Sequence, residues 1–260
     1  MAPKSTKSGM LLGVEYTPAE LMVAAAAREI RDGEVVFVGM RLPLIAFAVA
    51  KRTHAPRAVG LFESGLLRDV PATDLLYTMA DGPNVAGATW ATGLWEVMST
   101  LQRGEVDLGF IGGAEVDMHG NLNTSRIGPR DQPAVQLPGS GGAADIAGLA
   151  RRAVIIMPHE KRRLRPAVDY ITSLGHGAGS GRGGAPGGGP DALITTLGVF
   201  GFEAGRAVLR SYHPSTSVEE IRHKTGWEIV TAPNLASTTP PSPDELAAIR
   251  SYDPTGFWTA

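Results

Sequence analysis

The chain has 260 residues, with 24 Lys and Arg against 26 Asp and Glu, so its formal net charge is −2. It contains no cysteine, which excludes a disulfide scaffold, a cysteine-ligated metal site and a thiol nucleophile. The balanced charge and the low aromatic content, 6%, argue against a nucleic-acid partner. Apolar runs are too short for a signal peptide or for the ~20 residues that span a bilayer. We therefore expect a soluble, cytoplasmic protein without a membrane partner.

The predicted elements begin after a basic, mostly polar segment, residues 1–15, which we expect to be disordered. Residues 16–260 are expected to form one domain. Thr17 followed by Pro18 has the residue types of a helix N-cap and first helical position. The β-branched and aromatic run 34–38 then predicts a short buried strand.

Helices and strands continue to alternate along the chain. Further helices are predicted over residues 43–54, 92–103, 143–150 and 217–225, further strands over 58–62, 106–111, 153–157 and 169–172, and a two-stranded hairpin over 192–214. A last helix is expected in the C-terminal tail. This alternation predicts an α/β fold with an open, mainly parallel sheet flanked by helices.

One stretch departs from this pattern. Nine of the fifteen residues in 175–189 are glycine, and no aliphatic side chain there is larger than alanine. Such a composition is typical of a flexible segment, so we expect a glycine-rich surface loop over residues 175–190.

A carboxylate follows one of the predicted parallel strands. Glu63 comes directly after the strand 58–62 and is followed by Ser64 and Gly65. Because parallel sheets bind ligands outside the carboxyl ends of their strands, Glu63 is a candidate nucleophile or base. The alternative is a solvated glutamate without a chemical role.

A second candidate is a glycine-rich segment directly before the helix predicted at 143–150. Its backbone N–H groups can approach a ligand closely and suit an oxyanion or a phosphate, although a purely structural turn is the alternative. The residues are Gly139, Ser140, Gly141, Gly142 and Ala143. The charged run 159–163 is either a solvated face or a contact for an anion or another protein chain. The six scattered histidines have no metal-ligand spacing, so we expect no metal site.

Five segments occur in a fixed order along the chain: GMRLPLIAFAVAKR, FESGLL, FIGGAEVDMHGNLNTSRIG, PGSGGAADIA and MPHEKRRLRPAVDYITS. Together they resemble the B (beta) subunit of class I CoA-transferases, in particular glutaconate CoA-transferase. The resemblance extends from about Tyr16 to Ser173 and continues more weakly over 197–226. Each motif alone is unspecific, and their order makes the resemblance specific.

The resemblance implies the CoA-transferase (NagB-like) fold and a homologous A (alpha) subunit in an A₂B₂ heterotetramer. It implies that Glu63 is the catalytic residue and forms a covalent glutamyl-CoA thioester, with Ser64 and Gly65 supporting it. The segment from Gly139 to Ala143 would provide oxyanion and CoA contacts. The substrates would be a CoA ester, with a dicarboxylic or related acyl group, and a free carboxylic acid, and no bound cofactor is expected.

Two alternatives remain on this scaffold. One is a hydrolase or decarboxylase that acts on CoA esters, and the other is a non-catalytic binding protein. The presence of Glu63, Ser64 and Gly65 together favours the transferase.

Overall fold

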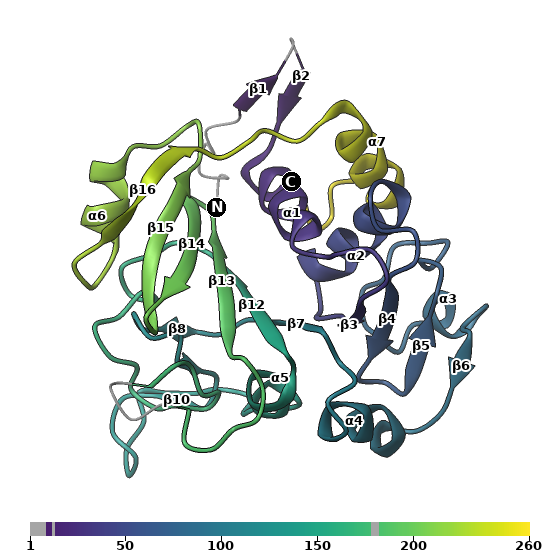
Figure 1. Cartoon of the computed structure of the whole chain (residues 1–260), viewed down its shortest axis with the longest axis horizontal. Helices are drawn as coiled ribbons and strands as arrows, with labels where there is room; N and C mark the ends of the chain where they lie inside the picture. Colours follow the sequence, from purple (N-terminus) through teal and green to yellow (C-terminus); the bar gives the residue numbers. More distant parts are fainter. Residues whose placement is uncertain (1–8, 12–13, 178–181) are drawn as a thin grey trace.

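The computed structural model describes residues 9–11, 14–177 and 182–260. Its centre is a ten-stranded sheet whose five middle strands are parallel (Figure 1). In sheet order these strands are β13 (Pro190–Thr195), β12 (Arg152–Met157), β7 (Leu108–Ile111), β3 (Val35–Phe37) and β4 (Val59–Phe62). The predicted α/β class with a mainly parallel sheet is confirmed.

Both faces of these strands are buried, and successive side chains face opposite layers. Val36 and Val38 pack in one apolar core, whereas Phe37 packs in the other. The first layer contains α1 (Pro18–Arg28), α2 (Leu42–Arg52) and α7 (Pro243–Tyr252), and the second contains α4 (Leu94–Gln102) and α5 (Ala143–Leu149). The two layers lie above and below the sheet in Figure 1.

The N-terminus of α1 follows the sequence prediction closely. The Thr17 hydroxyl accepts a hydrogen bond from the Glu20 amide at 3.0 Å, and the Glu20 carboxylate accepts one from the Thr17 amide at 2.8 Å. This reciprocal pair is a capping box, which satisfies amides that the helix itself leaves free. The helix ends at Arg28, and Gly33 lies in the turn before β3.

The remaining strands extend both sides of the sheet. They are β14 (Gly198–Glu203), β15 (Arg206–Tyr212) and β16 (Val230–Ser237) on one side, and β5 (Leu66–Arg68) and β6 (Trp90–Ala91) on the other. The hairpin predicted over 192–214 is wrong in its strand count, because three strands occupy it. The Thr195 hydroxyl accepts hydrogen bonds from the Leu197 and Gly198 amides, at 3.3 and 3.1 Å, and so stabilises a reversal inside the apolar run.

Smaller elements lie outside the main sheet. They are the short helices α3 (Gly82–Val85) and α6 (Val218–Lys224) and the strand pairs β1 (Gly9–Leu11) with β2 (Val14–Tyr16), β8 (Glu115–Val116) with β9 (Leu122–Asn123), and β10 (Arg126–Ile127) with β11 (Val135–Gln136). The first pair includes residues 9–11 and 14–15 of the segment for which we expect disorder. Residues 1–8 and 12–13 lie outside the described residues.

The strand predicted over 169–172 is absent. The Asp169 amide donates to the Glu115 carboxylate at 3.0 Å, and the Asp169 carboxylate accepts from the Gly128 amide at 2.8 Å. These side-chain contacts replace the backbone ladder that a strand requires, and only Ser173 forms a bridge, to Leu122.

The described ends of the glycine-rich segment 175–190 are packed. The Arg182 guanidinium donates to the carbonyl oxygens of Gly187 at 3.0 Å and Gly175 at 2.9 Å, and the Gly187 amide donates to the Gly148 carbonyl at 2.9 Å. Residues 182–189 carry no helix or strand, and the small residues of this predicted surface loop allow its backbone to pack beside α5. Residues 178–181 lie outside the described residues.

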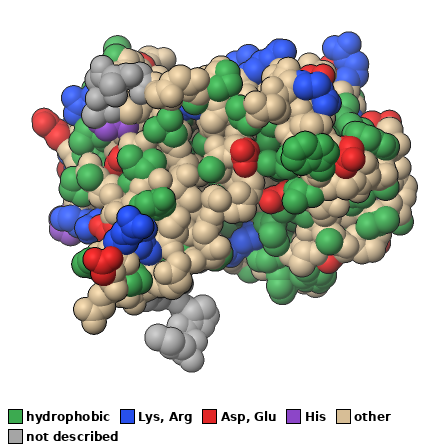
Figure 2. All heavy atoms as spheres, turned by 90° about the horizontal axis from the view of Figure 1, so that it is seen from below, with side chains coloured by type: hydrophobic (Ala, Val, Ile, Leu, Met, Phe, Trp, Pro, Cys, Tyr) green, Lys and Arg blue, Asp and Glu red, His purple; other side chains and the backbone are tan. Residues whose placement is uncertain are grey.

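Exposed apolar side chains occur near β6 and α4. The exposed fractions are 43% for Trp90, 55% for Leu94 and 81% for Trp95. Figure 2 shows hydrophobic side chains spread over the half of the molecule that carries these elements. Among the helices of the described chain, none has the length and hydropathy needed to cross a membrane.

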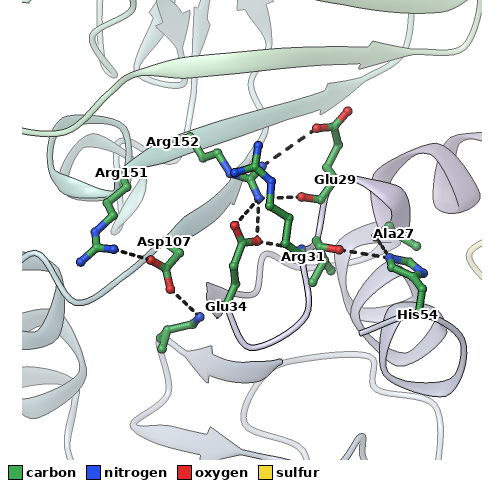
Figure 3. A network of polar contacts seen from close by, with 10 residues as sticks. Ala27, Glu29, Arg31, Glu34, His54, Asp107, Arg151 and Arg152 are labelled. Carbon is green, nitrogen blue, oxygen red and sulfur yellow. Dashed lines mark hydrogen bonds and ion pairs between the residues drawn. The ribbon is translucent and has the colours of Figure 1, made fainter. Parts of the chain in front are cut away.

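The amino ends of the parallel strands are joined by an amino-edge network of Arg152, Glu34, Asp107, Arg151 and Glu29 (Figure 3). One Arg152 nitrogen lies 2.6 Å from the Glu34 carboxylate, and both side chains are only 12% exposed. Asp107 accepts hydrogen bonds from the Val35 amide and from Arg151, each at 2.9 Å. The network therefore connects the starts of β3, β7 and β12.

Candidate active site

Glu63 lies in a three-residue turn, Glu63 to Gly65, that joins β4 to the antiparallel β5. The Gly65 amide donates to the Phe62 carbonyl at 3.0 Å, and Gly65 has a φ of +94°. A Cβ at Gly65 would lie only 2.2 Å from the Thr92 carbonyl oxygen. Hairpin loops of this length place a left-handed residue last, so the glycine fixes the turn that presents Glu63.

Ser64 and Glu63 point to different partners. The exposed Ser64 hydroxyl donates to the Met79 carbonyl at 2.8 Å, which fastens the turn to the segment before α3. The half-buried Glu63 carboxylate instead accepts a hydrogen bond from the Gly142 amide at 3.1 Å. A Cβ on Gly142 would lie 3.3 Å from the Glu63 carboxyl carbon, so glycine permits this close approach.

The amides of the glycine-rich segment before α5 differ in their hydrogen-bond acceptors. The Ala143 amide donates to the Ser140 carbonyl at 2.9 Å, and the Gly139 amide donates to the Thr124 carbonyl at the same distance. The Gly142 amide is directed at Glu63. Gly141 has a φ of +47°, is exposed, and its amide has no hydrogen-bond acceptor within the described chain.

A cavity of about 600 Å³ lies at the carboxyl edge of the sheet. Its lining includes the residues that follow all five parallel strands, namely Gly39, Glu63, Gly112, Pro158 and Thr196. Gly141, Gly142 and Ala143 line the same cavity, as does Ser140. The structure therefore brings the two candidate motifs together at the edge where parallel sheets bind ligands.

The cavity also contains polar groups that sequence reasoning missed. The Thr124 hydroxyl is buried and has no hydrogen-bond partner among the described residues. Arg41 lies directly before α2, and its guanidinium is 5.1 Å from the centre of the Trp258 ring. Arg41 is the arginine of the sequence GMRLP, but the sequence around it does not indicate that this residue lines the same cavity as Glu63.

A second, larger hollow of about 830 Å³ lies between α1, α2 and α7. Its lining includes no residue that follows one of the five parallel strands, and its Arg28 is paired with Glu245 at 2.6 Å. We therefore place the candidate site at the carboxyl edge.

The charged run 159–163 is only partly a solvated face. His159 is buried, and burial lowers its pKa from the ordinary value to about 4. Burial also lowers the pKa of His213, which follows β15, to about 4. The Arg163 side chain reaches the cavity and donates to Glu160 at 3.0 Å. Within the described ranges, no group of three or more His, Asp or Glu side chains could hold a metal ion.

This architecture is that of an α/β enzyme whose ligand cavity lies at the carboxyl edge of a parallel sheet. Residues 19–224 match the coenzyme A transferase family, and the chain belongs to that family. Members of this family use CoA esters as substrates.

Named relatives indicate which subunit of a CoA-transferase this chain is. The chain is 38% identical to the beta subunit of 3-oxoadipate CoA-transferase from Pseudomonas knackmussii, over 92% of this chain and 94% of the relative. It is 36% identical to the beta subunit of glutaconate CoA-transferase from Acidaminococcus fermentans, over 82% and 84% of the two chains. The prediction of a CoA-transferase beta subunit is therefore confirmed.

Solved structures agree with this assignment. Glutaconate CoA-transferase from Acidaminococcus fermentans matches with a TM-score of 0.84 and 31% identity, over 94% of this chain and 97% of the other. The decarboxylase AibA/AibB matches with a TM-score of 0.82 and 35% identity, over 93% and 97%. The relatives at 38% and 36% identity are both named CoA-transferases, so the comparisons do not favour a decarboxylase.

Proposed function

We propose that Glu63 is the nucleophile of this CoA-transferase, which moves CoA from the CoA ester of a dicarboxylic acid to a free carboxylic acid. The observation that carries the proposal is the position of the Glu63 carboxylate. It lies at the cavity and accepts a hydrogen bond from the Gly142 amide at 3.1 Å. The named relatives act on 3-oxoadipate and glutaconate, which supports a dicarboxylic acyl group.

The proposed reaction needs no external proton or cofactor. A Glu63 oxygen attacks the thioester carbonyl carbon, the carbon–sulfur bond breaks, and an acyl–glutamyl anhydride and free CoA thiolate result. The thiolate then attacks the Glu63 carboxyl carbon, the anhydride carbon–oxygen bond breaks, and the acid leaves as a carboxylate. A glutamyl-CoA thioester remains, and a second acid reverses the sequence to form the new CoA ester. Such covalent catalysis divides one difficult exchange into easier steps.

The Gly142 amide has a specific role in this scheme. When the thiolate attacks the Glu63 carboxyl carbon, negative charge develops on the glutamyl oxygen that this amide already contacts. A preorganised donor of this kind contributes about 10²–10³ in rate. The Ala143 amide is occupied by Ser140, so the Gly141 amide and the Thr124 hydroxyl are the better donors for the acyl oxygen.

The proposed partner is a homologous alpha subunit, in an A₂B₂ heterotetramer. The named relatives are B subunits, which supports a separate A subunit as the partner. The solved structures of glutaconate CoA-transferase and of AibA/AibB share the fold of this chain. The exposed Trp95 and Leu94 provide apolar area for such a contact.

A trapping experiment tests the assignment of Glu63. The chain is combined with its alpha subunit and an acyl-CoA, borohydride reduces any glutamyl thioester, and the modified peptide is mapped. We expect the modification on Glu63 and none in a Glu63→Gln variant, while Glu105→Gln, at an exposed glutamate, serves as the matched control.

Two outcomes would contradict the proposal. CoA exchange by a complex whose Glu63 stays unmodified would show that another group is the nucleophile. Release of free CoA or CO₂ without an acceptor acid would instead favour the hydrolase or decarboxylase.

A further inference from the structure

We propose that Arg41 binds the carboxylate at the far end of the acyl group and so selects dicarboxylic over monocarboxylic substrates. This inference rests on the proposed function, because it assigns the substrate end opposite to the thioester that Glu63 attacks. It adds a specificity residue to the site.

Arg41 is a cavity residue without a fixed anionic partner. It lines the same cavity as Glu63, and it forms no ion pair with a carboxylate in the part of the chain that the structure describes. Its guanidinium lies 5.1 Å from the centre of the Trp258 ring, which also lines the cavity. A cation over an aromatic face is held in place while its N–H edge stays open to a ligand.

The other cation of the cavity is engaged. Arg163 donates to the Glu160 carboxylate at 3.0 Å and so already has an anionic partner, which it shares with Arg162. Much of the remaining wall is apolar, with Phe110 and Ile156 among its residues. Arg41, which is itself exposed, is the cation of this cavity that has no anionic partner among the described residues, so a substrate carboxylate that loses hydration there gains most by meeting Arg41. A guanidinium offers two parallel N–H groups and binds a carboxylate in a bidentate manner.

The backbone of Arg41 supports a role for its side chain. Its φ is 68° and its ψ is −121°, a conformation that costs little for glycine and is unfavourable for any residue with a Cβ. Strained residues of this kind persist where the surrounding structure holds them, and they gather at ligand-binding positions. Here a long cationic side chain occupies the strained position and reaches the cavity.

Matched five-carbon thioesters test the inference. Formation of the borohydride-trapped adduct is timed with glutaryl-CoA and with valeryl-CoA in the complex with the alpha subunit. For Arg41→Gln we expect the rate with glutaryl-CoA to fall by at least about tenfold and the rate with valeryl-CoA to change by less than about twofold. Arg41→Lys should retain part of the preference. Arg57→Gln, which removes an exposed arginine that pairs with Asp32, should change neither rate.

A binding measurement separates this inference from the proposed chemistry. Calorimetry of the full chain with glutarate needs no turnover, and Arg41→Gln should weaken glutarate binding whereas Arg57→Gln should leave it unchanged. Equal effects on both thioesters, or glutarate binding that is unchanged by Arg41→Gln, would overturn the inference. If the wild-type complex forms no adduct with either thioester, the role of Glu63 fails, and the calorimetry still decides the role of Arg41.

Discussion

The two edges of the parallel sheet treat their polar groups in opposite ways. At the amino edge, the nearly buried Arg152 and Glu34 pair with each other, and Asp107 accepts hydrogen bonds from the Val35 amide and from Arg151. Among the described residues, one nitrogen of this network, Nη1 of Arg152, is buried without a hydrogen-bond partner. At the carboxyl edge, Arg41 and the Thr124 hydroxyl have no polar side-chain partner within the described residues. The polar groups of the amino edge therefore join strands. Those of the carboxyl edge are, in our proposal, the groups that bind the substrate.

This difference follows from the physics of buried polar groups. An unpartnered buried donor costs about 1–3 kcal/mol, so it persists only where something else compensates for it. Substitutions at the amino edge should therefore change stability, and substitutions at the carboxyl edge should change activity. Four predictions test this division.

The largest expected effect is on activity at the carboxyl edge. Glu63→Gln removes the nucleophile, and CoA exchange should fall by about 10⁴-fold or more, as loss of a nucleophile does in other covalent enzymes. The glutamine oxygen can still accept the Gly142 amide, so the free energy of unfolding should change by less than about 1 kcal/mol. Initial rates and urea titrations measure the two quantities. Residual exchange near the wild-type rate would refute the role of Glu63.

The next effect is on stability at the amino edge. Arg152→Ala leaves the Glu34 carboxylate buried without its cation, which should lower the free energy of unfolding by about 3 kcal/mol. Arg57→Ala, which breaks an exposed ion pair, should lower the free energy of unfolding far less than Arg152→Ala does. Urea midpoints at fixed pH give both values, and folded Arg152→Ala should keep the wild-type CoA exchange rate. A large loss of CoA exchange in the folded variant would contradict the expectation that the amino edge affects stability and not activity.

Because His159 and His213 are buried, we expect acid to lower the free energy of unfolding. Burial lowers the pKa values of His159 and His213 to about 4, below the ordinary value of 6.5. Between pH 6.5 and 4 the unfolded chain therefore binds protons at these histidines, whereas the folded chain does not. The stability is retained above pH 6.5 and is lost as the pH falls towards 4. Each histidine should contribute about 1.4 kcal/mol per pH unit in that window.

Urea titrations between pH 4 and 7 measure this slope. In His213→Gln the slope should fall by the contribution of one histidine. An identical slope in His213→Gln and the wild type would show that His213 is not the group that titrates.

The smallest expected effect concerns the Thr124 hydroxyl. Thr124→Val removes a buried hydroxyl that has no partner, so stability should stay constant or rise by up to about 1 kcal/mol. If the hydroxyl contacts the acyl oxygen, kcat should fall by about 10²-fold, since a donor used only in the transition state acts on kcat. Ser173→Ala, which also removes a buried hydroxyl without a partner but does not line the cavity, is the control. Equal kcat values in both variants would contradict a role for Thr124.

Much of the fold could be predicted because its signals are local. The Thr17 cap, the helix start at Pro43 and the apolar strand runs depend on residues within one or two turns of each other. The failures occurred where side chains override such signals. Thr195 reverses the chain within an apolar run, and Asp169 is held by side-chain contacts instead of a strand partner.

The sequence by itself determined the order of helices and strands, the family resemblance and the glycine that the Glu63 turn requires, because these depend on local backbone preferences and on motif order. Only the tertiary structure decided that Glu63 meets Gly142, 79 residues further along the chain, and that Arg41 faces the same cavity. Strand order in the sheet sets which carboxyl ends are neighbours, and that order is fixed by packing between distant segments.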